Sequence, residues 1–324
     1  MRRIAALLAL ALVAADTPDI SIPAEFGLIE GIAFDPGSRQ FYAGAVEDGA
    51  LLVKEGDHWR RTVLPYRTAG LFGMALDRQR GILWIASGVA GPTRAKQGFR
   101  GIIGVTALGL EAAGRAAVPA ADIASQPGDV AVGQDGTVYV SDGQAGNLYV
   151  CRPDCTELAA FVPAGTFKSL QGLAVSRDGK ALYVADYGRG LWRIDLKKPK
   201  IVTQISQLNG IDGLVRDGDA LVAIVNGDGR KIVRLVLDPT GTSVASETVL
   251  ATPPGPGDPT LGIVMGGKLI YVADAQWDRF DDQGSPKSPA RATHIESLQL
   301  PPGPRPPEMR AKPDKERRPA RPSF

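Results

Sequence analysis

The sequence predicts an all-β protein, a six-bladed β-propeller with four-stranded blades. Three observations lead to this fold class. One strand-rich unit recurs six times, its apolar runs are four to six residues long, and glycine, proline and aspartate separate them. A repeat of about 40–50 residues with four strand signals is the mark of a propeller blade. A β-sandwich is the competing fold, but it would not explain six near-equivalent repeats.

The fourth repeat, Gln171 to Asp195, shows the unit clearly. It reads Q-G-L-A-V-S-R-D-G-K-A-L-Y-V-A-D-Y-G-R-G-L-W-R-I-D, which is an apolar strand, a D-G turn, an alternating strand, a glycine turn and a third strand. Asp-Gly between two apolar runs favours a hairpin, because a type I′ turn needs positive φ at both central residues.

The other five repeats follow the same plan. They begin, in chain order, with E-G-I-A-F at Glu30, F-G-M-A-L at Phe72, G-D-V-A-V at Gly128, D-G-L-V-R at Asp212 and L-G-I-V-M at Leu261. Successive repeats start 42, 56, 43, 41 and 49 residues apart. The long second spacing contains an insertion, a glycine-rich basic loop at residues 88–101.

The ring must close through a strand that completes the last blade. Two segments have a suitable alternating pattern, Thr293 to Leu300 and the I-S-I-P stretch near Ile20. The sequence does not show which of these two segments completes the last blade.

The chain begins with a pattern typical of a secretory signal. Arg2 and Arg3 precede an apolar run, Ile4 to Ala15, that ends in small residues. A membrane anchor is the alternative, but it needs roughly 20 apolar residues. We expect a signal peptide at residues 1–15, a mature protein that starts at Asp16 in the periplasm or outside the cell, and no transmembrane span.

The propeller is expected to occupy residues 16–300, followed by a tail at residues 301–324. This Pro/Arg-rich tail has eight prolines in 24 residues, a composition that predicts disorder. The formal net charge is +2, but the leader adds two arginines and the tail seven basic against three acidic residues, which leaves the body near −4. Nucleic-acid binding is therefore not expected. We expect a monomer that binds a small molecule.

The two cysteines, Cys151 and Cys155, are too far apart for a C-x-x-C redox centre. An exported protein favours a disulfide, and opposed residues of a tight hairpin have the Cα separation that a bridge needs. We predict a Cys151–Cys155 disulfide across a hairpin. Two free thiols near a turn are the alternative.

In a propeller, the loops that enter the innermost strands converge at one mouth of the central channel. The position before each aligned residue is occupied, in blade order, by Glu30, Phe72, Gly128, Gln171, Asp212 and Leu261. Carboxylate and carboxamide oxygens suit a hard cation such as Ca²⁺ or Mg²⁺ and tolerate Mn²⁺ or Zn²⁺. The alternative is that Glu30 and Asp212 each cap backbone N–H groups at a blade start.

Three further aspartates, Asp142, Asp186 and Asp274, end the second strand of their blades. They could ring the cavity, but Asx motifs within their own turns explain them better, because the same slot recurs from blade to blade. A Ser-His-Asp triad has little support, since the only histidines are His58 and His294 and no G-x-S-x-G motif is present.

With these motifs the chain resembles the gluconolactonase and regucalcin (senescence marker protein) propellers. The likeness rests on E-G in the first repeat, on the Q-G-L-A-V-S-x-D-G-K block in the fourth and on N-G-I-D-G in the fifth. It implies a divalent metal, held by a Glu, two Asn and an Asp, that polarises a lactone carbonyl and activates water. Glu30 and Asp212 match two of these ligands, whereas Gly128 and Gln171 stand where the family has asparagine.

The resemblance implies an exported, divalent-metal-dependent hydrolase of a lactone or related cyclic ester. The metal ligands would be Glu30, Gln171 and Asp212, with Asp212 also taking a proton from water and Ca²⁺ as the expected ion. We expect Phe72, Asp129 and Asp258 to contact the substrate. The alternative is a non-catalytic envelope propeller that binds a small molecule, a glycan or a protein at one rim.

Overall fold

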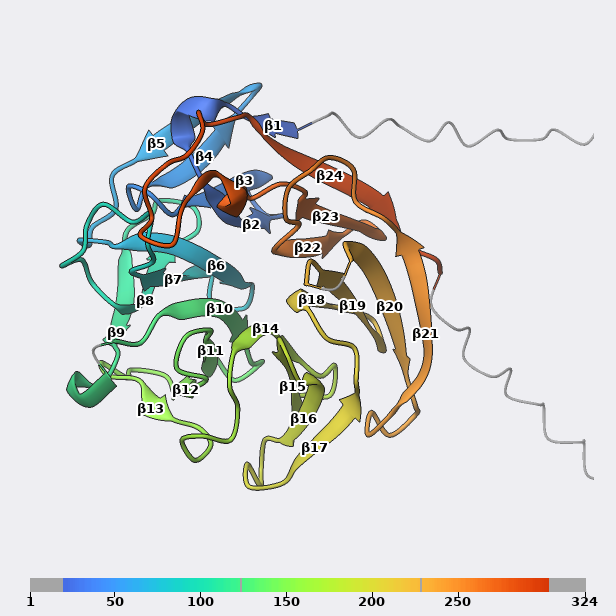
Figure 1. The fold of residues 1–324 in the computed structure, drawn as a ribbon. Helices are drawn as coiled ribbons and strands as arrows, with labels where there is room; N and C mark the ends of the chain where they lie inside the picture. The colour runs from blue at the N-terminus through green and yellow to red at the C-terminus, as the bar shows by residue number, and fades with distance from the viewer. Residues whose placement is uncertain (1–19, 123, 228, 303–324) are drawn as a thin grey trace, which may run out of the picture.

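The computed structural model describes residues 20–122, 124–227 and 229–302, and it is a six-bladed β-propeller (Figure 1). Each blade is a four-stranded antiparallel sheet, as the repeats predict. The predicted signal peptide and the tail from residue 303 onward lie outside the described residues. Within the described ranges, no helix has both the length and the apolar composition that a bilayer crossing requires.

The first three blades are built in chain order from the channel outward. Their strands are β2 (Ile29–Asp35), β3 (Gln40–Ala45), β4 (Leu51–Glu55) and β5 (His58–Thr62); β6 (Gly70–Asp77), β7 (Ile82–Gly88), β8 (Gly101–Thr106) and β9 (Ala112–Ala117); β10 (Pro127–Val132), β11 (Val138–Asp142), β12 (Leu148–Cys151) and β13 (Ala159–Ala160).

The fourth and fifth blades repeat this plan, and the sixth differs in its outermost strand. The strands are β14 (Leu170–Val175), β15 (Ala181–Asp186), β16 (Gly190–Asp195) and β17 (Val202–Ser206); β18 (Ile211–Asp217), β19 (Ala220–Val225), β20 (Lys231–Leu237) and β21 (Val244–Ala251); β22 (Gly262–Met265), β23 (Lys268–Val272), β24 (Thr293–Gln299) and β1 (Ile20–Ile22).

Both segments that could close the ring are used in the sixth blade. β24 pairs with β23 as its third strand, and the N-terminal β1 pairs with β24 as its fourth (Figure 1). Ile22 of β1 is fully buried in a cluster that includes Ile295 of β24 and Ile32 of the first blade. Burial of this apolar side chain between the last and first blades stabilises the closed ring.

The innermost strands pack against one another around the channel. Each of them contacts the innermost strand of the next blade, and β22 contacts β2 to complete the circle. This contact leaves no space for a side chain at Gly31, where a Cβ atom would lie 2.5 Å from the carbonyl oxygen of Phe72. At Gly172 it would lie 2.4 Å from the backbone nitrogen of Leu214. Gly31 and Gly172, which each follow a site position directly, are therefore needed for blade-to-blade packing.

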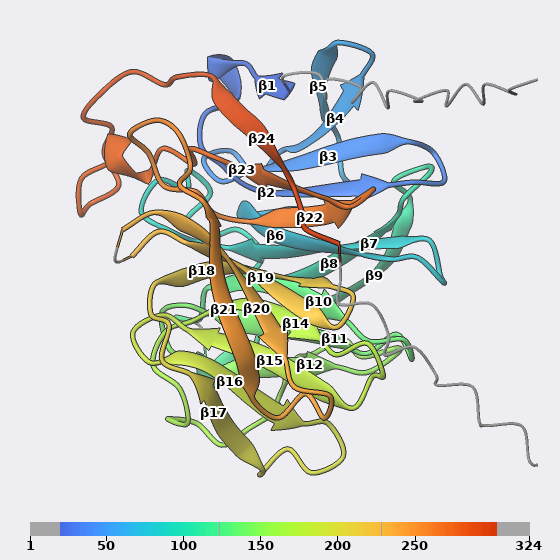
Figure 2. The same cartoon turned by 90° about the vertical axis from the view of Figure 1, so that its right-hand side faces the viewer.

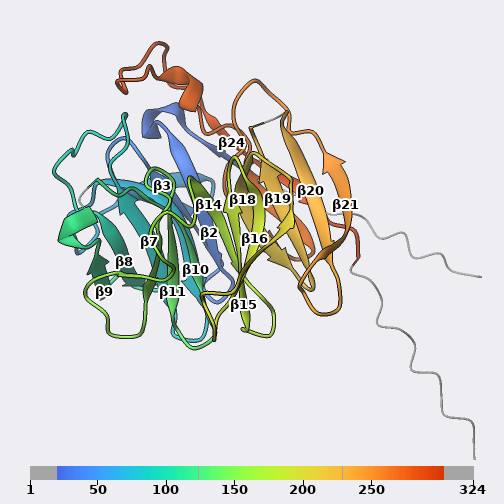
Figure 3. The same ribbon diagram turned by 60° about the horizontal axis from the view of Figure 1, so that its bottom comes forward.

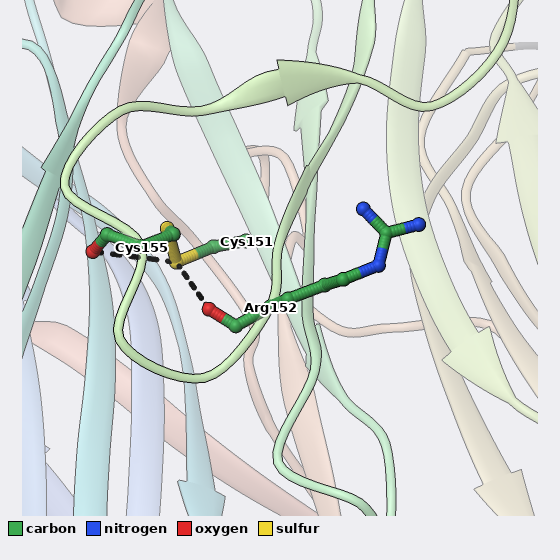
Figure 4. The surroundings of a disulfide bond; sticks show 3 residues. All are labelled: Cys151, Arg152 and Cys155. Atoms are coloured by element: carbon green, nitrogen blue, oxygen red, sulfur yellow. Dashed lines mark hydrogen bonds between the residues drawn. A yellow bond between two sulfur atoms is a disulfide. The ribbon is translucent and has the colours of Figure 1, made fainter.

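The predicted disulfide is present, with a Cα–Cα distance of 5.5 Å between Cys151 and Cys155 (Figure 4). The position of Cys155 differs from the prediction, because it lies in the turn between β12 and β13 rather than opposite Cys151 in a strand. The bridge therefore closes the connection between the third and fourth strands of this blade. Both cysteines pack against the hydrophobic cluster between the second and third blades.

Candidate functional site

A polar cavity of about 700 Å³ occupies one mouth of the channel. All six positions that the repeat alignment selects line it: Glu30, Phe72, Gly128, Gln171, Asp212 and Leu261. In the first five blades, the pairing of the first and second strands is interrupted by a β-bulge at this position. A bulge removes a residue from the ladder and re-aims its side chain, so the same local irregularity directs four side chains toward the mouth, while Gly128 of the third blade has none.

Glu30 lies in the first blade and is almost completely buried. Its Oε2 accepts a 2.6 Å hydrogen bond from the indole Nε1 of Trp277, whereas its Oε1 accepts none from the described residues. Burial raises the pKa of Glu30 well above its ordinary value, and the negative charge of Asp212 raises it further, against the opposing effect of the Trp277 hydrogen bond. Glu30 thus offers one free oxygen to the cavity.

Asp212 lies in the fifth blade and is held by an oriented carboxamide. Asn226 Nδ2 donates to Asp212 Oδ2 at 3.0 Å and to the carbonyl of Pro259 at 3.1 Å. The Tyr187 hydroxyl donates to Asn226 Oδ1 at 2.8 Å, which fixes the orientation of the amide. Burial, followed by the charges of Asp129 and Asp258, raises the pKa of Asp212 to about 7. Within the described chain, Asp212 Oδ1 has no hydrogen-bond donor.

Asp129 and Asp258, expected to contact substrate, both line the cavity. Asp129 is engaged on both oxygens: Oδ1 accepts from the amide of Val130 at 2.7 Å, and Oδ2 accepts from the amide of Leu173 in the next blade at 3.0 Å. Burial raises its pKa to about 7. Asp258 is half-buried, and burial followed by the charges of Asp278 and Asp274 raises its pKa. Asp129 therefore links two blades, whereas Asp258 remains open to a ligand.

Carboxamides and aromatic rings make up much of the rest of the lining, and Lys96 is the one cation among the described lining residues. Gln126, Gln144 and Gln171 contribute carboxamides that make no hydrogen bond with the described residues. Phe72, Tyr187 and Trp277 add aromatic surface. A ligand would thus meet carboxylates, the ammonium group of Lys96, and amide groups that both donate and accept.

Two long loops form the rim on the side of the first blade. One is the predicted insertion at residues 88–101, and the other joins β23 to β24 and carries the short 3₁₀ helix η3 (Trp277–Arg279), which projects from one face of the ring (Figure 3). The two backbones touch, because a Cβ atom on Gly284 would lie 2.0 Å from the carbonyl carbon of Gly91.

Glu47 of the first blade holds both loops. Its Oε1 accepts from Arg279 Nη1 at 3.3 Å, and its Oε2 accepts from Arg94 Nη2 at 3.3 Å. Glu47 and Arg279 are both largely buried, which limits screening of this ion pair by solvent. The contact fixes η3 at its end, and so places Trp277 against Glu30.

Three residues of this site were missed from sequence: Asn226, Tyr187 and Trp277. Asn226 directly follows the apolar run of β19, and a polar residue at that point was a usable signal. Tyr187 has the same place after β15. Trp277 lies in the loop between β23 and β24, where no repeat pattern identifies it.

The three strand-end aspartates do not line the cavity. Asp142 Oδ1 accepts from the amides of Gln144 and Ala145, and Asp274 Oδ1 accepts from the amide of Gln276, as Asx motifs predict. Asp186 differs, because its carboxylate accepts from the amides of Lys168 and Ser169 in the loop that enters β14. These aspartates organise turns and blade entrances.

The donor chemistry of the mouth fits a hard divalent cation. The described residues contain no group of three or more His, Cys, Asp or Glu side chains arranged around one metal position. A site here would therefore rest on Glu30 and Asp212, each with one oxygen free, together with the carboxamide of Gln171. The negative charge of Asp212 raises the pKa of Glu30, and a cation between the two carboxyl groups would relieve that repulsion.

No protein-family profile matches the chain, and no curated protein matches its sequence. Solved structures do match. Regucalcin from Agrobacterium tumefaciens, described as calcium-binding, aligns with a TM-score of 0.58 at 15% identity, over 87% of this chain and 96% of its own. A gluconolactonase from Xanthomonas campestris aligns with a TM-score of 0.57 at 16% identity, over 86% and 88%.

The same fold also occurs in proteins with other activities. The PQQ-bound aldose sugar dehydrogenase from Streptomyces coelicolor aligns with a TM-score of 0.58 at 17% identity, over 86% of this chain and 96% of its own. These likenesses confirm the predicted six-bladed propeller fold, which this chain shares with gluconolactonase and regucalcin. The chemistry must be argued from the cavity itself, because one fold hosts many functions.

Proposed function

We propose that this protein hydrolyses a small cyclic ester, a lactone, in the cavity at the channel mouth. The observation that carries the proposal is the pair of buried carboxyl groups, Glu30 and Asp212. Each keeps one oxygen fixed by a neutral donor and presents the other to the cavity. Perturbed pKa values in a concave polar cavity are typical of catalytic groups.

Asp212 is the proposed general base. A pKa of about 7 leaves a large fraction of this carboxyl ionised at neutral pH, yet basic enough to accept a proton from water. Its Oδ1 would take the proton of the water that attacks the lactone carbonyl. Asn226, itself held by Tyr187, keeps Oδ2 in place, so that Oδ1 stays directed at the cavity. The ring C–O bond then breaks, and the same proton passes to the leaving ring oxygen.

A divalent cation would be held by Glu30, Gln171 and Asp212, with Ca²⁺ as the first candidate. When bound, such an ion supplies positive charge that polarises the carbonyl and makes water more acidic. Trp277 keeps the Glu30 carboxylate in one orientation through its 2.6 Å hydrogen bond. The calcium-binding description of regucalcin and the lactonase named among the structural matches agree with this assignment.

The walls of the cavity favour a polyhydroxylated ring as substrate. Gln126, Gln144 and Gln171 carry carboxamides without partners among the described residues, and these can exchange hydrogen bonds with hydroxyl groups. The partly exposed ring of Tyr187 can pack on a ring face. We further propose, from the N-terminal leader pattern in the sequence, that the enzyme acts in the periplasm or outside the cell.

The test is hydrolysis of D-glucono-δ-lactone, followed by release of acid, with and without Ca²⁺. Asp212→Asn should reduce kcat at least a hundredfold, because the isosteric amide keeps the hydrogen bond to Asn226 but cannot accept a proton. Asp186→Asn is the matched control: this buried aspartate lies in the neighbouring blade, outside the cavity, and its replacement should leave kcat within twofold. Equal rates for wild type and Asp212→Asn across a panel of lactones would refute the proposal.

A non-catalytic binding role is the second candidate, because Gly128 brings no side chain to the third blade's position at the mouth. It predicts a ligand that binds without being consumed. Calorimetry with an unreactive polyol, combined with product analysis after long incubation with lactones, separates the two roles. Binding without turnover would favour the non-catalytic propeller.

A further inference from the structure

The cavity at the channel mouth has more acidic than basic groups. Four carboxyl groups and one ammonium group belong to its described lining residues: Glu30, Asp129, Asp212 and Asp258 on one hand, and Lys96 on the other. Lys96 is exposed, and its Nζ donates to two backbone carbonyls of its own loop rather than to a carboxylate. A ligand with a positive charge therefore suits this cavity better than one with a negative charge.

Asp258 differs from the other three carboxyl groups. Glu30, Asp129 and Asp212 are almost completely buried, and each accepts at least one hydrogen bond. The side chain of Asp258 is half-buried and accepts no hydrogen bond within the described ranges. Keeping a half-buried carboxylate ionised costs less than keeping a buried one ionised. Asp258 is thus a charged group of the lining that has no fixed partner.

The arginines of this part of the rim are bound to other groups. Arg230 donates to two backbone carbonyls of the loop before Asp258. Arg291 pairs with Asp274 at 3.0 Å and with Asp278 at 3.1 Å. Burial, followed by the charges of Asp278 and Asp274, raises the pKa of Asp258, and Arg230 lowers it by less. The neighbouring charges thus add to the negative potential at Asp258, which attracts a cationic group.

We propose that the substrate carries an ammonium group beside its hydroxyl groups, as the lactone of an amino sugar acid does, and that Asp258 is the specificity-determining residue for this group. The lactone ring rests on the function proposed above, whereas the ammonium group follows from the cavity alone. A carboxylate forms strong charge-assisted hydrogen bonds with an ammonium group. Tyr187 and Trp277, partly exposed in the same lining, add aromatic rings, which attract cations.

Isothermal titration of the mature full-length protein tests ammonium binding without any turnover. D-glucosamine and D-glucose are the probes, because they differ only by an amino group in place of one hydroxyl group. At pH 6, where this amine is protonated, D-glucosamine should bind about tenfold more tightly than D-glucose or better. Asp258→Asn should remove the difference by weakening D-glucosamine binding, and should leave D-glucose binding within about twofold.

Asp278→Asn is the matched control, because Asp278 is paired with Arg291 and does not line the cavity. It should keep the preference for D-glucosamine within about twofold of wild type. Equal affinities of wild type for the two sugars would overturn the ammonium class. A preference that survives in Asp258→Asn, or that is lost equally in Asp278→Asn, would overturn the role of Asp258.

Hydrolysis of a second matched pair separates this proposal from the proposed function. Homoserine lactone and α-hydroxy-γ-butyrolactone share one ring and differ by an ammonium group against a hydroxyl group. The comparison uses KM, because the ammonium group also activates the neighbouring carbonyl. Wild type should show a KM about tenfold lower for homoserine lactone, and Asp258→Asn should raise that KM without changing kcat more than about twofold. Equal KM values would refute the amino substrate and leave lactone hydrolysis standing. A preference for D-glucosamine without turnover of either lactone would support ammonium binding and refute hydrolysis.

Discussion

Replacing Asp212 by asparagine should remove much of the pH dependence of the protein's stability. In the folded protein, burial and the charges of Asp129 and Asp258 raise the pKa of Asp212 from 3.8 to about 7. The protonated form is therefore the one that folding favours. Its contribution to stability is complete below about pH 3.8 and disappears as the pH rises through about 7. Wild-type protein should lose stability over this range, and the variant should lose less.

The magnitude follows from the size of the pKa change. A pKa of about 7 instead of 3.8 corresponds to about 4 kcal/mol over the full range, of which about 2–3 kcal/mol falls between pH 5 and pH 8. Asparagine has the same shape and keeps the hydrogen bond to Asn226, but it carries no charge. Removing the Asp212 charge also removes the largest electrostatic cause of the raised pKa of Glu30. The variant should therefore be the more stable protein at pH 8.

Urea unfolding at pH 5, 6, 7 and 8, without divalent cations, measures this effect. We expect the free energy of unfolding of wild type to fall by about 2 kcal/mol more than that of Asp212→Asn between pH 5 and pH 8. Asp186→Asn, outside the cavity, should follow the wild-type pH dependence. Parallel pH profiles for wild type and Asp212→Asn would refute the argument that desolvated carboxylates repel one another at the mouth.

Three further predictions concern the metal, the ring and the disulfide. At pH 8, millimolar Ca²⁺ should raise the Tm of wild type by several degrees and leave that of Asp212→Asn unchanged; equal shifts would contradict a site at Asp212. Gly31→Ala should lower the free energy of unfolding by about 2 kcal/mol, because its Cβ would lie 2.5 Å from the Phe72 carbonyl, whereas Gly188→Ala, with open space around it, should change little in urea titration. Cys151→Ser combined with Cys155→Ser should cost about 2 kcal/mol or less, because the closed loop is short, and a loss of folding would show a larger role.

Much of the candidate site could be read from the repeat pattern. The alignment placed Glu30, Gln171 and Asp212 at equivalent positions of three blades, and the structure brings all three to one cavity. This succeeded because a propeller turns equivalent positions in sequence into neighbours around the channel. Asp129 shows what the repeat alignment could not predict. Its sequence position predicts a cavity residue. Only the packing of the neighbouring blade shows that the backbone amide of Leu173 donates a hydrogen bond to one of its carboxylate oxygens.

The partners of the two carboxylates could not be predicted in the same way. Trp277 is 247 residues from Glu30 in the chain, and it reaches Glu30 only because the sixth blade closes the ring beside the first. Glu47 holds that loop through Arg279, which lies 232 residues away. Such contacts depend on how irregular loops fold over the rim, and loops carry no periodic signal.

The sequence by itself determined the strands, the turns and the number of blades, because strand alternation and turn chemistry are local properties that recur in every repeat. It also determined which residue of each blade stands at the mouth. The tertiary structure decided how the ring closes, with β1 beside β24, and which oxygens of the site remain free. These features depend on burial and on contacts between distant segments, which exist only once the six blades are packed into a ring.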